Sequence, residues 1–293
     1  MKETGLTIIV PIYNEKDGIE NTLQDLEQMR KDADFEVEVL LVNDGSDDGS
    51  KEVLGKISCE GVSVIHHSVN RGYGTALKTG VRNARHKCVV ITDADGTYPN
   101  ERIPELIKVF QEGNYDMVVG ARVGDNVKIP LIRKPAKWFI TKLASYLAGT
   151  KIPDLNSGLR VMKKEVVEKY IRILPDGFSF TSTITLAMLT NGYSVKYVPI
   201  AYFKREGKSK IKPIQDTLNF IQLIIRTVLY FNPLKVFVPL SLFLVLLAFL
   251  VLLGSWFLTG KAMDVTFGVV LMTAVMVMTI GMLADLIDKR MID

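Results

Sequence analysis

The stretch VVITDADGT, residues 89–97, decides how this chain folds and where its chemistry lies. It begins as an apolar, β-branched run typical of a buried strand and turns into two aspartates one residue apart, Asp93 and Asp95. An Asp-x-Asp pair in a turn lets carboxylate oxygens reach one hard cation from the same side. Alone the tripeptide is a weak signal, because aspartate is common in turns as a backbone cap. Its meaning depends on the segments around it.

Apolar runs of the same kind flank this stretch. Strands are predicted at residues 6–10, 37–42, 62–66, 89–92, 117–119 and 194–200. Helical patterns lie between them at about 15–30, 49–57, 72–85 and 102–112, and a further helix is expected after residue 177. This alternation predicts βαβ units and a mostly parallel sheet with both faces covered. Ligands of such sheets lie beyond the carboxyl ends of the strands, so the residues that follow each strand are the candidates for function.

Four segments follow predicted strands and carry polar groups: PIYNE (11–15), NDGS (43–46), DADG (93–96) and GAR (120–122). Asp44 taken alone could be only a turn and helix cap. Together with Asp93 and Asp95 it places three acidic side chains at one edge of the sheet, which is unfavourable unless a cation or a donor-rich ligand lies there. A metal ion and a nucleotide would satisfy this edge.

Two long apolar runs close the chain. Residues 236–258 and 265–284 contain no charged side chain. Each run is long enough to cross a hydrocarbon core of about 30 Å. Buried core helices of a soluble protein are the alternative, but these are normally shorter. The connection, residues 259–264, is too short for a domain, so the two spans form a hairpin. Basic residues on both outer flanks, Arg226 and Lys235 before and Lys289 and Arg290 after, predict that the N-terminal domain is cytoplasmic.

Two further segments are amphipathic or basic. Residues 126–153 mix basic and apolar side chains at helical spacing, which predicts a helix lying on the membrane or over the site, or ordinary core packing. Residues 203–212 (FKREGKSKIK) are strongly basic and suit phosphates or anionic headgroups, although a solvated surface is the alternative. The predicted domains are 1–210 (cytoplasmic), 211–232 (an interfacial amphipathic helix) and 233–293 (the transmembrane hairpin).

Composition excludes several other classes. The formal net charge of +4 is too small to indicate a nucleic-acid partner. Only two cysteines are present, Cys59 and Cys88, and in a reducing compartment they are expected to be isolated thiols. The first residues lead directly into a strand, without the basic region and cleavage site of a secretory signal.

The order and spacing of these motifs resemble family 2 inverting glycosyltransferases of the dolichol-phosphate mannose synthase type. The resemblance runs from PIYNE through the RxGxSK segment, about residues 6–212, and implies a glycosyltransferase A-type (Rossmann-like) α/β domain with a two-helix membrane anchor. The nucleotide-sugar-binding residues that it implies are Pro11, Tyr13, Glu15, Val42, Asp44, Asp93, Ala94, Asp95, Arg122, Lys204, Arg205 and Lys210.

The resemblance also implies roles within this set. Asp93 and Asp95 would hold the diphosphate and a Mg²⁺ or Mn²⁺ ion, with Asp95 a direct ligand. Arg122 would face the phosphates of donor and acceptor, so Asp95 and Arg122 are the expected catalytic residues. Related enzymes often carry glutamine two residues after the second aspartate as a further metal ligand, whereas this chain has Thr97, whose hydroxyl or a water is expected to substitute.

The absence of an acidic general base from one segment indicates the kind of acceptor. Enzymes of the family that act on hydroxyls carry a later acidic general base, but residues 178–185 (FSFTSTIT) contain no carboxylate. A phosphate monoester is already anionic near neutral pH and needs no base. The candidates to hold such a phosphate are Arg122, Arg133, Lys134, Ser157 and Arg160. Asp154 and Asn156 are expected to cap a turn.

The sequence therefore predicts transfer of one sugar from GDP-mannose or a UDP-hexose to a polyprenyl phosphate, dolichyl or undecaprenyl, at the cytoplasmic membrane face. Membrane lipid is an expected partner, and a homo-oligomer is possible. Transfer to a lipid or glycan hydroxyl is one alternative. A non-catalytic membrane scaffold that binds a nucleotide-sugar is the other.

Overall fold

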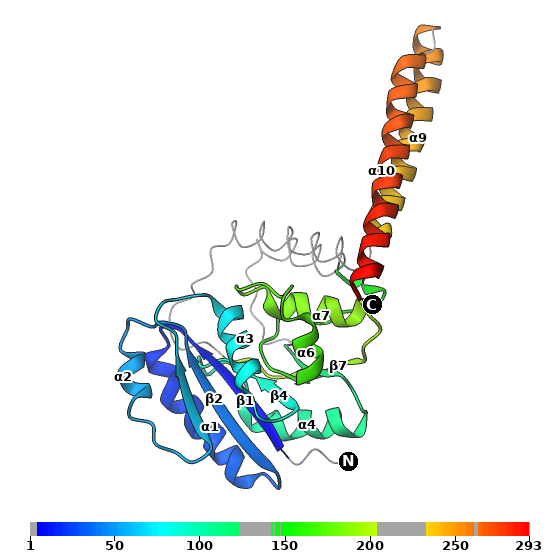
Figure 1. Cartoon of the computed structure of the whole chain (residues 1–293). Helices are drawn as coiled ribbons and strands as arrows, with labels where there is room; N and C mark the ends of the chain where they lie inside the picture. Colours follow the sequence, from blue (N-terminus) through cyan, green and yellow to red (C-terminus); the bar gives the residue numbers. More distant parts are fainter. Residues whose placement is uncertain are drawn as a thin grey trace. The chain divides into compact units, whose positions relative to one another are not determined.

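The computed structural model describes residues 5–122, 142, 144–146, 148–203, 233–260 and 263–292. These residues belong to two compact units, Met1–Phe220 and Ile221–Asp293 (Figure 1). The first contains a sheet with its covering helices, and the second contains a helical hairpin. Most of the amphipathic segment 126–153, the basic segment from 204 and the predicted interfacial helix at 211–232 lie outside the described residues.

The first unit is built on a seven-stranded sheet with the order β3-β2-β1-β4-β6-β5-β7. The strands are β1 Gly5–Ile12, β2 Glu36–Asn43, β3 Val62–His66, β4 Cys88–Ile91, β5 Met117–Arg122, β6 Arg160–Lys163 and β7 Val195–Ile200. Only β6 runs antiparallel to its neighbours, β4 and β5. The predicted mostly parallel α/β sheet is therefore confirmed, and each strand expected from the apolar runs is present.

Helices cover both faces of this sheet (Figure 1). They are α1 Lys16–Asp32, α2 Ser50–Leu54, α3 Tyr73–Asn83, the 3-10 turn η1 Asn100–Arg102, α4 Ile103–Glu112, α6 Lys164–Tyr170 and α7 Phe180–Thr190. Alternate strand residues face opposite sides, so Ile8 and Val10 share a core with α1 and α4. The other face receives α3, whose Gly80 leaves room for Ile9. Burial on both faces explains the unbroken apolar runs of the central strands.

The strand order decides which segments meet. Because β1 lies between β2 and β4, the segments that follow these three strands emerge side by side at the carboxyl edge. Strand β6 is antiparallel and begins where its neighbours end, with Arg160 opposite Ile91 of β4 and Val119 of β5. The residues before Arg160 therefore lie at the same edge. The sequence did not predict β6 or α6, because a four-residue strand that starts with arginine lacks a recognisable apolar pattern.

Helix α1 packs directly beneath the aspartate turn. A Cβ atom added to Gly18 would collide with the carbonyl oxygen of Ala94 and lie 3.2 Å from the Cα of Asp95. Only glycine permits this approach, so the first turn of α1 supports the backbone that carries Asp93 and Asp95.

The second unit is an antiparallel hairpin of α9 Leu234–Thr259 and α10 Asp264–Ile292 (Figure 1). Small side chains lie between the helices: Ala248 and Ala274 are fully buried, and the hydroxyl of Ser241 donates to the Ala274 carbonyl oxygen at 2.9 Å. Large apolar side chains point outward. The stretches Leu234–Leu258 and Asp264–Ile287, of 25 and 24 residues, are long and apolar enough to cross a membrane. They contain both predicted spans.

The Gly18 contact gives a test of this packing. Gly18→Ala is expected to destabilise the protein by about 1–3 kcal/mol, because the new methyl group must displace the Asp93–Asp95 turn. The gain in helix propensity, about 1 kcal/mol, acts in the opposite direction. Gly55→Ala is the matched control, since its Cβ would meet only ordinary contacts, the nearest at 3.4 Å. Urea unfolding of both variants measures the difference, and equal midpoints would contradict the proposed contact.

Candidate functional site

The segments that follow β1 and β2 are tied to each other. Asn14 adopts a left-handed backbone conformation with φ of 53°, which asparagine tolerates better than most residues. Its side-chain amide donates to Asp47 Oδ1 at 2.7 Å, and its Oδ1 accepts the Asp47 backbone N–H at 2.9 Å. The Asn14 N–H donates to the Ser46 hydroxyl at 3.0 Å. These bonds fix the loops expected to hold a nucleotide.

The residues implied to contact the base lie within this frame. Pro11 and Val42 are register partners across β1 and β2, and both are buried. Tyr13 and Glu15, in the following turn, are half-buried. They lie at one edge as expected, and their contact with a nucleotide remains a prediction.

Asp44 is held by protein groups. It is 2% exposed, and its Oδ1 lies 2.7 Å from the His67 ring nitrogen and accepts the Arg71 N–H at 3.0 Å. Its Oδ2 accepts the Gly72 N–H at 2.7 Å. The Asp44 carboxylate thus closes the loop that leads from β3 into α3, a function that the sequence did not indicate.

The aspartate pair is braced from two sides. Asp93 is half-buried, and its Oδ1 accepts the Tyr73 hydroxyl at 3.0 Å. Asp95 is 7% exposed, and its Oδ1 accepts both the backbone N–H and the hydroxyl of Thr97, at 3.2 and 2.6 Å. Thr97 itself is fully buried. Thr97 therefore orients Asp95, and direct ligation of a metal by its hydroxyl stays a prediction.

The donor set of the aspartate pair fits a hard divalent cation. Asp93 and Asp95 offer carboxylate oxygens, and Mg²⁺ commonly takes one or two carboxylates and completes its octahedron with phosphates and water. Across the described residues no group of three or more His, Cys, Asp or Glu side chains gathers as a complete protein cage. The space around Asp93 is also shaped by Gly158, where a Cβ would lie 2.7 Å from Asp93 Oδ2. An ion held here would depend on oxygens of a bound substrate.

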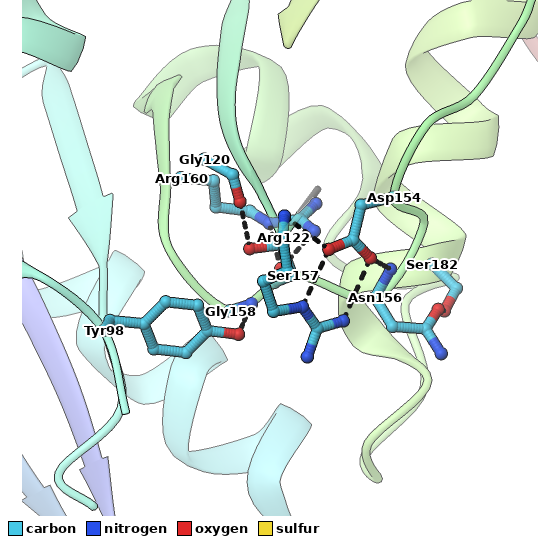
Figure 2. A network of polar contacts seen from close by, with 9 residues as sticks. All are labelled: Tyr98, Gly120, Arg122, Asp154, Asn156, Ser157, Gly158, Arg160 and Ser182. Carbon is cyan, nitrogen blue, oxygen red and sulfur yellow. Dashed lines mark hydrogen bonds and ion pairs between the residues drawn. The ribbon is translucent and has the colours of Figure 1, made fainter. Parts of the chain in front are cut away.

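Arg122, at the end of β5, is paired with Asp154 (Figure 2). Its Nε donates to Asp154 Oδ2 at 2.7 Å, its Nη2 to Oδ1 at 2.9 Å, and its backbone N–H to Oδ2 at 3.0 Å. The guanidinium also lies 5.1 Å from the Tyr202 ring centroid. In the part of the chain that the structure describes, Nη1 has no acceptor, so the free edge of the guanidinium is available to an anion.

The Arg122–Asp154 pair sets the charge of both groups. Burial raises the pKa of Asp154, but the hydrogen bonds and positive charge of Arg122 outweigh it and hold that pKa below its usual value. Burial would likewise lower the pKa of Arg122, yet the Asp154 carboxylate raises it. Asp154 does cap the turn as predicted, since it accepts the Asn156 N–H at 3.2 Å. The ion pair with Arg122 is the finding that the sequence did not provide.

The loop from Asp154 to Arg160 is fixed from within (Figure 2). The Ser157 hydroxyl donates to the Gly120 carbonyl oxygen, and the Gly158 N–H donates to the Tyr98 hydroxyl at 2.6 Å. Ser157 and Arg160 are both fully buried. Their polar groups hold the loop, so their placement does not support direct contact with an acceptor phosphate. Arg133, Lys134, Lys204, Arg205 and Lys210 lie outside the described residues.

Comparison with known proteins agrees with this geometry. The family model described as glycosyl transferase family 2 matches residues 7–171. A dolichyl-phosphate hexose transferase of Haloferax volcanii is 32% identical over 225 residues, covering 76% of this chain and 94% of the relative. A bactoprenol glucosyl transferase of Shigella phage SfV is 32% identical over 173 residues, covering 58% of this chain and 55% of the relative.

Solved structures share the fold of the first unit. Glucosyl-3-phosphoglycerate synthase from Mycobacterium tuberculosis, in complex with Mn²⁺, UDP and its product, gives a TM-score of 0.56 at 17% identity. The match covers 78% of this chain and 79% of that one. Mannosyl-3-phosphoglycerate synthase from Rubrobacter xylanophilus gives a TM-score of 0.58 at 18% identity, over 77% and 72% of the two chains. At these identities the likeness establishes the fold alone.

Removal of the Asp154 charge tests the ion pair. Asp154→Asn is expected to destabilise the protein by about 2 kcal/mol or more at pH 7, because it leaves a largely buried guanidinium without its counter-charge. The lowered pKa of Asp154 means that its stabilisation is present above the ordinary aspartate pKa of about 4 and is lost as the pH falls through the folded-state value. The difference from wild type should therefore shrink in acid.

Urea unfolding between pH 7 and pH 3 measures both effects. Asp176→Asn is the control, because Asp176 pairs with Lys78 through a carboxylate that is 70% exposed. Such surface pairs contribute about 0–1 kcal/mol. Equal losses in the two variants would show that the Arg122–Asp154 pair has no special weight.

Proposed function

Because this chain belongs to glycosyl transferase family 2, we propose that it transfers one sugar from a nucleotide-sugar to a polyprenyl phosphate, with inversion at the anomeric carbon. One observation carries the proposal: a metal-suited aspartate pair and a paired arginine with a free edge lie at the same carboxyl edge, after β4 and β5. The first arrangement suits a diphosphate, and the second suits another anion. The names of the dolichyl-phosphate and bactoprenol relatives support a lipid phosphate as that anion.

The donor would bind across β1, β2 and β4. Pro11, Tyr13, Glu15, Val42 and Asp44 would surround the base and ribose of a UDP- or GDP-sugar. Asp93, Ala94 and Asp95 would face the diphosphate, with Asp95 held in place by the buried Thr97 hydroxyl. A Mg²⁺ or Mn²⁺ ion bound to the aspartates would supply positive charge that stabilises the departing nucleoside diphosphate. The structural neighbour that was crystallised with Mn²⁺ and UDP supports a divalent metal.

The acceptor would bind on the Arg122 side. An oxygen of the lipid phosphate attacks the anomeric carbon, and the bond from that carbon to the diphosphate oxygen breaks, with its electron pair leaving on the nucleoside diphosphate. No proton has to be removed, because a phosphate monoester is largely ionised near neutral pH. The free edge of Arg122 would hold the attacking phosphate in line.

The Asp154 carboxylate does not favour a hydroxyl as the acceptor. A hydroxyl acceptor needs a general base whose pKa lies near the working pH. Asp154 is the carboxylate paired with Arg122 in Figure 2, but both its oxygens bind that guanidinium and its pKa is held low. Asp154 thus acts as a counter-ion that fixes Arg122, and phosphate remains the favoured acceptor.

The membrane segments suit such an acceptor. Two helices able to cross a bilayer would keep the enzyme where a polyprenyl phosphate resides. The basic flanks of the hairpin favour a cytoplasmic catalytic domain. On the same sequence grounds Arg133 and Lys134 would meet the lipid phosphate, and Lys204, Arg205 and Lys210 would close over the donor diphosphate.

Purified full-length protein in detergent or vesicles tests the proposal. With Mg²⁺ or Mn²⁺, a panel of UDP- and GDP-sugars, and undecaprenyl or dolichyl phosphate, we expect a lipid-linked monosaccharide whose anomeric configuration is opposite to that of the donor. Chelation should abolish its formation. Asp95→Asn should lower kcat by about 100-fold or more, because charge stabilisation at the leaving group is lost.

Asp34→Asn serves as the control, since Asp34 is exposed between α1 and β2. It should leave kcat unchanged. The proposal is wrong if no donor yields a lipid-linked sugar, if Asp95→Asn retains full activity, or if a lipid alcohol is glycosylated faster than the lipid phosphate.

A further inference from the structure

Tyr98 lies three residues after Asp95, and its hydroxyl has no function in the proposed reaction as described above. The side chain is 4% exposed, and its ring packs edge-on against Tyr202 with centroids 5.5 Å apart. The Tyr98 hydroxyl accepts the Gly158 N–H at 2.6 Å. Among the described residues its own proton has no acceptor. Buried tyrosine hydroxyls usually donate as well as accept, so this proton calls for a partner.

Arg160 acts on the same peptide group from the other side. It is fully buried, and its Nε and Nη2 donate to the Ser157 carbonyl oxygen at 3.1 and 2.5 Å. Its Nη1 donates to Thr181 O and Thr185 Oγ1, at 3.0 and 2.9 Å. All of these acceptors are neutral, and in the part of the chain that the structure describes no carboxylate forms an ion pair with Arg160. Two of its three nitrogens donate to the Ser157 carbonyl oxygen, so that peptide group receives the largest share of its hydrogen bonds.

The Ser157 carbonyl and the Gly158 N–H belong to that single peptide group, so Arg160 and Tyr98 are joined through it (Figure 2). A cation on the carbonyl oxygen makes the N–H a stronger donor, and a strong donor to the phenol oxygen makes the phenol O–H a stronger donor in turn. The chain of bonds thus prepares the Tyr98 hydroxyl to donate to an anionic oxygen.

The surroundings of Tyr98 indicate which anion this is. A Cβ placed on Gly158 would lie 2.7 Å from Asp93 Oδ2 and 3.1 Å from Tyr98 Cε2, so the Tyr98 ring and the Asp93 carboxylate flank the same glycine. Burial raises the pKa of Tyr98, and the charge of the nearby Arg122 acts against that rise. A group between the aspartate pair and Arg122 would be a phosphate in the proposed reaction.

We propose that Tyr98 is a phosphate-binding residue whose hydroxyl donates a hydrogen bond to a phosphoryl oxygen, either of the donor diphosphate or of the acceptor phosphate. The proposal rests on the proposed function for the identity of these ligands. Arg160 and Gly158 are positioning residues that hold and polarise the hydroxyl.

Tyr98→Phe in the full-length protein tests this directly, because it keeps the ring and removes only the hydroxyl. Tyr197→Phe is the matched control: Tyr197 also has a buried hydroxyl, and this hydroxyl makes no hydrogen bond with the described residues. Binding of UDP or GDP with Mg²⁺, and of the corresponding nucleoside, is measured by calorimetry. The KM for polyprenyl phosphate is measured kinetically. Loss of one hydrogen bond to a charged group corresponds to about a tenfold change.

If the hydroxyl contacts the donor, Tyr98→Phe weakens diphosphate binding about tenfold and leaves nucleoside binding unchanged. If it contacts the acceptor, diphosphate binding is unchanged and the KM for polyprenyl phosphate rises by a similar factor. The proposal is overturned if both quantities stay within about twofold of wild type, if nucleoside binding falls equally, or if Tyr197→Phe gives the same loss.

A second substitution distinguishes a lost contact from misfolding. Tyr98→3-fluorotyrosine retains the hydroxyl and makes it more acidic, so phosphate affinity should equal or exceed that of wild type, whereas a tenfold loss would contradict the proposal. The binding of UDP or GDP can be measured without catalytic turnover. A wild-type protein that makes no lipid-linked sugar would therefore refute the proposed function and still leave the contact of Tyr98 with a nucleoside diphosphate open to measurement.

Discussion

The candidate site depends on one buried cation, Arg160. Placing a guanidinium in the protein interior is costly unless its donors are satisfied, and here they bind the Ser157 carbonyl, the first turn of α7 and the Thr185 hydroxyl. These bonds hold the loop that begins at Asp154. The loop in turn fixes Arg122 through Asp154 and meets Tyr98 through Gly158. One arginine at the start of a short antiparallel strand therefore organises the half of the site around Arg122.

The two halves of the site are built by different means. On the proposed donor side, successive parallel strands deliver their loops to one edge, and contacts such as Asn14 to Asp47 fix them. On the proposed acceptor side, β6 enters between β4 and β5 in the opposite direction. This insertion separates Arg122 from the aspartate turn by one strand and fills the gap with the Ser157–Gly158 peptide. In the proposed reaction the phosphates lie between the aspartate pair and Arg122.

The carboxylates of the site are paired with a cation or oriented by hydroxyl groups. Asp154 is committed to Arg122, and Asp93 and Asp95 are oriented by the Tyr73 and Thr97 hydroxyls. These three carboxylates thus accept hydrogen bonds that orient them or pair them with a cation. Such an arrangement suits a reaction in which a leaving group must be stabilised and the nucleophile is already ionised. The family and the lipid-phosphate relatives are consistent with that chemistry.

The sequence by itself determined the parallel strands, the positions of PIYNE, NDGS and the aspartate turn at their ends, and the two apolar helices, because these features follow from local periodicity and turn chemistry. The metal suggestion for Asp93 and Asp95 has the same origin. Strand β6, the Arg122–Asp154 pair, the enclosure of Thr97 and the joining of Arg160 to Tyr98 were decided by tertiary structure alone. Each links residues far apart in the chain, as Tyr98 and Gly158 are, and no local pattern records which distant groups a sheet brings together.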